Sequence, residues 1–172
     1  MTENYVASAF AQEMKEEYAS TRKCLERIPE SLYGYKPHPT SMEMGYLTLL
    51  VAEIPLWIYH TIKTGEIDFA TFRHFELSTT EKLLEHYEDS FKKALEILGN
   101  TTADEMEETF SLKRDGKVLF SSSKKNSVSS SINHWVHHRG QLTVYMRMNE
   151  IAVPSIYGPS ADDQVYATPG SA

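Results

Sequence analysis

Apolar residues recur every three or four positions in four long stretches of this chain, and this spacing predicts four helices. The four stretches are residues 4–27, 40–64, 78–98 and 127–149. The first three are followed by Pro29, Gly65 and Gly99, which are typical helix stops. The sequences Thr-Ser-Met-Glu at 40–43 and Ser-Thr-Thr-Glu at 78–81 have the form of capping boxes, which satisfy unpaired N–H groups at a helix start.

Between the third and fourth helices the pattern changes from helical spacing to alternation, over residues 109–120. Alternation of apolar and polar residues is typical of a half-buried strand. A three-residue loop with Gly116 in the left-handed conformation would place Leu112 opposite Val118. We therefore predict a short β-hairpin here.

Four amphipathic helices of about 20 residues with short or medium connections predict an all-α fold, a four-helix bundle. The length of 172 residues suits a single domain that spans residues 1–172. The C-terminal segment, about 164–172, is expected to be irregular because it ends in small and polar residues.

Composition excludes several classes of protein. A net charge of -7 disfavours a nucleic-acid partner, because binding phosphates requires clustered Lys and Arg. Cys24 is the only cysteine, so we expect neither an intrachain disulfide nor a thiolate zinc site. Residues 1–10 lack the pattern of a signal peptide, and no apolar run has membrane-spanning length. We expect a cytoplasmic protein with no membrane partner.

The fourth helix carries the chemistry. His134 and His138 are four residues apart and share a helix face, a spacing at which two imidazoles can reach one metal ion. Gln141 and Tyr145 extend the same stripe, since each helical residue turns about 100°. Two interpretations stay open: the stripe is a solvent-facing side of the helix, or it lines a polar cavity inside the bundle.

Two neighbours of this pair have other expected roles. His137 lies to the side of the stripe, so we expect it on the surface or supporting a ligand from outside. Arg139 falls on the apolar side of the helix, where an arginine usually forms a buried or interfacial ion pair with a carboxylate, so we expect a structural role.

Two regions of the sequence resemble the signatures of a known family. The C-terminal region contains NHWVHHRGQLTVYMR at 133–147 and VPSIYGPSAD at 153–162, and the second predicted helix contains HPTSMEMGYL at 38–47 and VAEIPLW at 51–57. In this order they resemble the signatures of the DinB/YfiT-like superfamily. The resemblance implies a bundle of up-down-down-up type, often a homodimer, and a divalent metal held by three histidines.

In that family two of the metal ligands lie on the fourth helix, and they map onto His134 and His138. The third comes from the second helix, directly before Val-Ala-Glu-Ile-Pro, and here that position is Leu50. An apolar side chain cannot bind a metal, and zinc or nickel sites usually take at least three protein ligands. Characterised relatives include thiol transferases that use low-molecular-weight thiols.

Glu53 is the best candidate to replace the missing ligand, since it lies one turn from Leu50 and would complete a set of two histidines and one carboxylate. The alternative, which we favour, is that Glu53 pairs with a basic side chain or caps the helix near Pro55. Tyr46, Leu50, Gln141 and Tyr145 are the expected lining of a pocket, with Tyr145 a candidate proton donor.

Three functions follow from this sequence. The first is a dimeric bundle with an incomplete, two-histidine metal site that binds a small molecule. The second is a metal-dependent enzyme, such as a thiol transferase or hydrolase, in which zinc or nickel on His134 and His138 activates a thiol or water. The third is a DNA-associated stress protein, against which the net charge argues.

Overall fold

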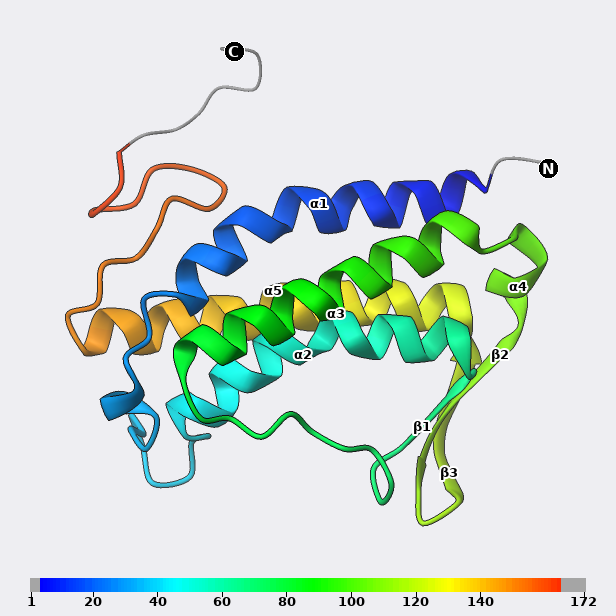
Figure 1. Cartoon of the computed structure of the whole chain (residues 1–172), viewed down its shortest axis with the longest axis horizontal. Coiled ribbons are helices and arrows are strands. Elements are labelled where there is room, and N and C mark those ends of the chain that lie inside the picture. The colour runs from blue at the N-terminus through cyan, green and yellow to red at the C-terminus, as the bar shows by residue number, and fades with distance from the viewer. Residues whose placement is uncertain (1–3, 165–172) are drawn as a thin grey trace.

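Four long helices form most of the fold in the computed structural model, which describes residues 4–164 (Figure 1). They are α1 (Tyr5–Leu25), α2 (Met44–Lys63), α3 (Thr80–Asn100) and α5 (Lys124–Met148). Helices α1 and α2 each pack against both α3 and α5. We call these four helices the helical body. The four predicted helices are therefore present, with shifted ends.

Neither of the two predicted capping boxes forms as expected. Helix α2 begins at Met44 after Glu43, which makes no side-chain cap bond, while the Thr40 hydroxyl lies 2.8 Å from Nδ1 of His38. Helix α3 is capped by Thr79, whose hydroxyl accepts the N–H of Lys82, so this helix starts one residue later than the motif implies. At α2 the nearby imidazole of His38 takes the Thr40 hydroxyl that the motif assigns to the cap.

Two short helices were not predicted from the sequence. The 3-10 helix η1 spans Glu30–Leu32, and helix α4 spans Ala103–Glu107. Helix α4 has a true capping box, in which the Thr102 hydroxyl accepts the N–H of Glu105 and the Glu105 carboxylate accepts the N–H of Thr102. A helix of five residues is too short to show an apolar period, so only the cap could have revealed it.

A three-stranded sheet lies at one end of the helical body (Figure 1). Strand β2 (Thr109–Arg114) pairs in antiparallel fashion with β3 (Lys117–Ser123), as predicted for a hairpin, and in parallel with β1 (Glu66–Asp68). The all-α prediction therefore needs a correction: the chain is mostly helical, with a small sheet. Strand β1 has three residues, which is too few to show alternation.

The register of the hairpin also differs from the prediction. Leu112 lies opposite Phe120 rather than Val118, and a shift occurs between Leu112 and Lys113. The turn has two residues, Asp115 and Gly116, both with positive φ (52° and 74°). Such a two-residue turn matches the twist of the strands, and the bulge then absorbs the extra residue in β3.

A buried ion pair connects α5 to α1. Arg139 is 2% exposed, and its Nη1 lies 2.5 Å from Oε2 of Glu17. Arg139 also donates from Nη2 to the hydroxyl of Tyr157 at 2.9 Å, and that hydroxyl donates to Oε1 of Glu17 at 2.8 Å. The predicted structural role of Arg139 is confirmed, and the network fixes the C-terminal segment on the helical body.

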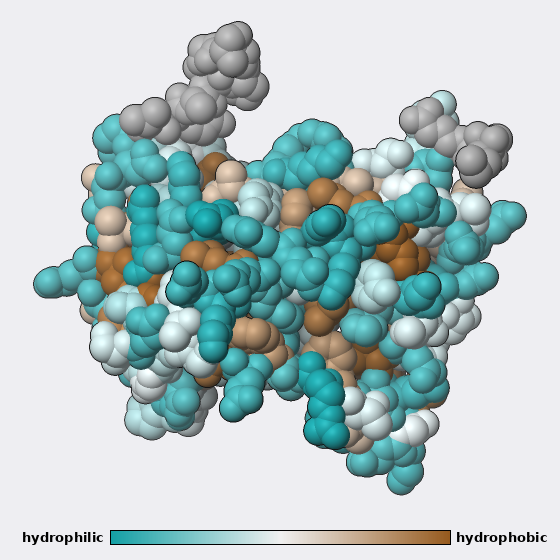
Figure 2. Space-filling model, viewed as in Figure 1, coloured by the Kyte–Doolittle hydropathy of each residue, from teal (hydrophilic) through white to brown (hydrophobic). Residues whose placement is uncertain are grey.

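The surface in Figure 2 is mostly hydrophilic, with hydrophobic residues in separate patches. Within residues 4–164, no helix combines the length and the apolar character needed to cross a membrane. The irregular segment predicted at 164–172 lies almost wholly outside the described residues.

Candidate functional site

His134 and His138 point toward each other on α5, one turn apart. Their Nε2 atoms are 2.6 Å apart, and their ring centroids are separated by 4.3 Å. His138 is 8% exposed and His134 is half-buried, whereas His137 is exposed on the side of the helix. The stripe on α5 is therefore not simply a solvent-facing side, because it brings two imidazole nitrogens into direct contact.

Gln141 fixes the protonation pattern of the pair. Its Oε1 lies 2.7 Å from Nδ1 of His138, and a carbonyl oxygen can only accept, so this Nδ1 carries the proton. Nε2 of neutral His138 then has a free lone pair, and it accepts a hydrogen bond from Nε2–H of His134. The two imidazoles therefore hold opposite tautomers and share one proton between facing nitrogens.

Burial keeps both imidazoles neutral. Desolvation, followed by the neighbouring His138 and His137, lowers the pKa of His134 to about 4. Desolvation also lowers the pKa of His138, while the hydrogen bond that His138 donates to Gln141 acts in the opposite direction. Neutral imidazoles can donate a lone pair to a metal or exchange a proton with a bound molecule.

Helix α2 supplies the opposite wall, because it packs against α5. The ring of Trp57 lies 5.7 Å from that of His134, and its Nε1 is buried without a hydrogen-bond partner among the described residues. Leu50 is 6% exposed and Tyr46 is 48% exposed. The hydroxyl of Tyr145 donates to the carbonyl of Met42 at 3.2 Å, so this predicted proton donor already has an acceptor.

Glu53 is fully buried on α2, and its carboxylate holds the segment that connects β1 to α3. Oε2 lies 2.6 Å from Nδ1 of His74, and Oε1 accepts the backbone N–H of Phe75 at 2.5 Å. Nε2 of His86, on α3, lies 3.8 Å from Oε1. These contacts agree with the interpretation that Glu53 pairs with a basic side chain.

We call residues 69–79, the part of this connection that follows β1, the strap. Figure 1 shows the connection returning along the helical body to the start of α3. Residues 73–79 have no regular secondary structure, and Phe72 packs edge-on against Trp57 at 6.3 Å. The sequence pattern did not indicate the roles of Phe72, His74 and His86. The density of aromatic residues in Phe-Ala-Thr-Phe-Arg-His-Phe at 69–75 was the available signal.

The residues present do not supply a three-ligand metal site. Among residues 4–164, no group of three or more His, Cys, Asp or Glu side chains is placed to hold a metal ion. His134 and His138 provide two nitrogens, Leu50 provides none, and Glu53 would have to leave His74 and Phe75 to become a ligand. The geometry therefore fits a proton-sharing pair better than a complete coordination sphere.

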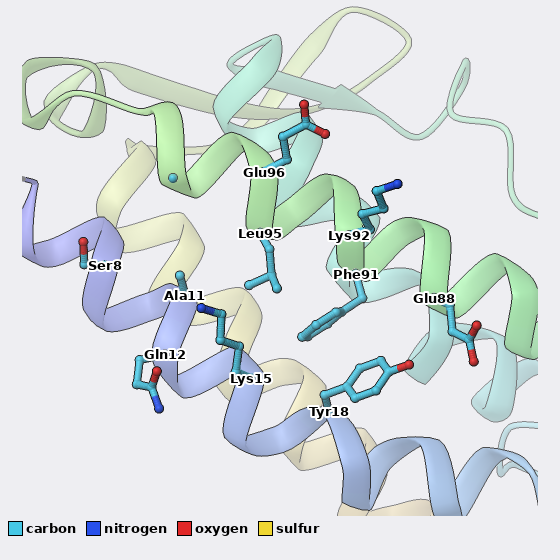
Figure 3. A pocket seen from close by; sticks show the side chains of 11 residues that line it. Ser8, Ala11, Gln12, Lys15, Tyr18, Glu88, Phe91, Lys92, Leu95 and Glu96 are labelled. Carbon is cyan, nitrogen blue, oxygen red and sulfur yellow. The ribbon is translucent and has the colours of Figure 1, made fainter.

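Two cavities lie away from this pair, and neither is lined by Tyr46, Leu50, Gln141 or Tyr145. The first, about 1090 Å³, is an open groove between α1 and α3, with the side chains of Tyr18, Phe91 and Leu95 in its floor (Figure 3). The second, about 350 Å³, lies between α2, β1 and the strap.

Fold and site together define a mostly helical protein with a histidine pair on one long helix. The profile of the DinB family matches residues 1–168, so the chain belongs to the DinB family.

Two solved structures share the fold. A DinB-like protein of Bacillus subtilis, YjoA, is 22% identical with a TM-score of 0.62, and the match covers 87% of this chain and 94% of that one. A DinB-like protein of Bacillus cereus is 20% identical with a TM-score of 0.65, covering 87% and 97%. The uncharacterized protein YrdA of Bacillus subtilis is 53% identical over 32 residues, which span only 19% of either chain.

The low pKa of His134 predicts a loss of stability in acid. The unfolded chain, with a pKa near 6.5, binds more protons than the folded chain between pH 6.5 and about 4, so the free energy of unfolding rises with pH across this window. We expect His134→Gln to reduce this rise by about 1 to 2 kcal/mol, allowing for partial exposure. Urea unfolding of both proteins at pH 6.5 and at about pH 4 measures this change in the free energy of unfolding. His38→Gln, in an exposed loop, should leave the rise unchanged, and equal effects of the two variants would contradict the assignment.

The contacts of Glu53 predict that the strap loosens when its charge is removed. We expect Glu53→Gln to increase hydrogen exchange at the Phe75 amide about tenfold or more, because a charged acceptor forms the stronger bond. The matched control is Glu76→Gln, an exposed glutamate on the same strap. Equal exchange at Phe75 in the two variants would show that Glu53 does not hold this segment.

Proposed function

We propose that this DinB-family chain is a small-molecule-binding protein whose metal site has been reduced to a proton-sharing histidine pair. The observation that carries the proposal is the short contact between Nε2 of His134 and Nε2 of His138, together with Leu50 where the family resemblance implies a third ligand. A metal ion between these nitrogens needs a lone pair from each, so His134 would have to change its tautomer. For its Nδ1–H, the described residues offer no hydrogen-bond partner that would stabilise the new form.

The decisive experiment restores the missing ligand. We expect the wild-type chain to retain no zinc after dialysis, and Leu50→His to bind near one zinc per chain with at least tenfold higher affinity, because the family resemblance implies the third imidazole ligand at this position. Metal content by mass spectrometry and zinc titration by calorimetry measure this. Leu50→His combined with His138→Ala is the control, and it should lose the metal again.

Metal binding by the wild-type chain would favour the second candidate, a metal-dependent thiol transferase or hydrolase. Near one zinc or nickel per wild-type chain, lost in His138→Ala, would contradict the proposal and require a substitute third ligand. Loss of metal in Glu53→Ala would then identify that ligand as the carboxylate. The observation that supports this candidate is that Nε2 of His134 and Nε2 of His138 face each other, as two ligands of one metal ion would.

We further propose that the chain has the up-down-down-up bundle topology, works in the cytoplasm without nucleic acid, and forms a homodimer. Val144 and Met148 support the dimer, since they are four residues apart on α5 and 57% and 54% exposed. Apolar side chains exposed together on one helix face are typical of an interface between copies.

A charge on this face should therefore separate the copies. We expect Val144→Lys to convert the dimer to a monomer in sedimentation equilibrium, because a buried unpaired ammonium is costly. Val118→Lys, at an equally exposed valine on the β2–β3 hairpin, is the matched control and should leave the dimer intact. Dissociation by Val118→Lys alone would place the interface on the hairpin instead.

A further inference from the structure

The pocket beneath the strap has the volume of a small-molecule site and is open to solvent on one side. Its volume is about 350 Å³, between the second half of α2, strand β1 and the strap. This volume lies within the range typical of ligand pockets. Its lining combines apolar side chains with polar ones: Leu56, His60, Thr64, Glu66, Ile67, Asp68, Thr71, Phe72 and Arg73.

Both carboxylates in this wall already have partners. Asp68 accepts the backbone N–H groups of Ala70, Asp115 and Gly116, and these bonds, that of Ala70 first, lower its pKa. Glu66 forms an ion pair with Lys113. The backbone N–H groups stabilise the ionised form of Asp68 and engage both of its oxygens, and Lys113 pairs with Glu66, so both acids already have donors.

Arg73 is different, because its guanidinium is exposed and has no ion pair or hydrogen bond among the described residues. His60 also lines the pocket, and its ring nitrogens have no hydrogen-bond partner among the described residues. Burial, followed by Lys93, lowers the pKa of His60, so this imidazole is neutral near pH 7 and offers one donor and one acceptor. Arg73 is therefore the charged side chain of this lining that has no partner among the described residues, so its guanidinium is the group available to an incoming anion.

Phe72 connects this pocket to the histidine pair. Its ring is a wall of the pocket and lies edge-on to His60 at 5.7 Å and to Trp57 at 6.3 Å. Trp57 in turn packs on His134. Two aromatic side chains therefore separate the pocket from the paired imidazoles.

We propose that this pocket binds a small organic anion, with its anionic group on Arg73 and its apolar part against Leu56 and Phe72. A guanidinium presents a planar fork that matches a carboxylate or phosphate, and the apolar wall favours a hydrocarbon or aromatic body. The inference names a ligand class for the small-molecule role proposed above and rests on it. It does not depend on whether His134 and His138 hold a metal.

The probe is 4-phenylbutyrate, compared with its neutral isostere 4-phenylbutyramide, on wild-type protein in EDTA. We expect saturable shifts of the Thr64, Thr71 and Arg73 amide signals in two-dimensional NMR, with a Kd of about 1 mM. The amide should bind at least fivefold more weakly, and so should the acid to Arg73→Gln. Arg114→Gln, an exposed arginine outside the pocket lining, should change the Kd less than twofold.

Several results would overturn the proposal: equal affinity for acid and amide, equal loss in the two arginine variants, saturable shifts only in the groove between α1 and α3, or no saturation at ~20 mM probe. The metal measurements on Leu50→His remain separate from this test. A chain that binds zinc but also binds phenylbutyrate through Arg73 would disprove the proposed loss of the metal site and leave this pocket in place.

Discussion

The carboxylate of Glu53 is the interaction on which the arrangement around the histidine pair depends. A buried carboxylate with no partner is strongly destabilising, so the chain must bring donors to it. Those donors are the imidazole of His74 and the backbone N–H of Phe75, both on the strap. Glu53 thereby anchors the strap next to Phe72, whose own backbone N–H donates to the carbonyl of Asp68 at 2.8 Å. The ring of Phe72 packs against Trp57, which in turn packs on His134.

This dependence also explains why Glu53 is a poor metal ligand in the present arrangement. Turning its oxygens toward α5 would leave His74 and the Phe75 amide without their acceptor. The ring of His86 would lose its nearest carboxylate as well, although its Nε2 already has no hydrogen-bond partner among the described residues. A metal would have to offset all of these losses. The carboxylate of Glu53 therefore positions the strap beside the histidine pair, and for the same reason it is not available as a metal ligand.

Much of the fold could be predicted from sequence, since long amphipathic helices repeat their signal over many turns. Arg139 was also predictable, because an arginine on the apolar side of a helix needs a carboxylate, and Glu17 provides it. The histidine pair followed from spacing alone. The strap could not be predicted. Its bonds join His74 and Phe75 to Glu53, more than 20 positions earlier in the chain, and an irregular backbone has no period that would reveal such contacts. Strand β1 was not predicted and the hairpin register was predicted wrongly for a related reason, since both depend on how one strand pairs with another.

The geometry of the pair suggests why two histidines can remain together without a third. Two lone pairs facing each other repel, and a site of three histidines relies on a cation to hold them. Here the hydrogen bond to Gln141 selects the Nδ1–H tautomer of His138, and His134 has the Nε2–H tautomer. The facing nitrogens are therefore a donor and an acceptor, and they attract each other. A buried leucine at position 50 adds no further lone pair and requires no partner. In the function proposed above, replacing one ligand by an apolar residue turns a group of side chains that needs a metal into one that is stable by its own hydrogen bonds, and the neighbouring pocket binds its ligand without a metal.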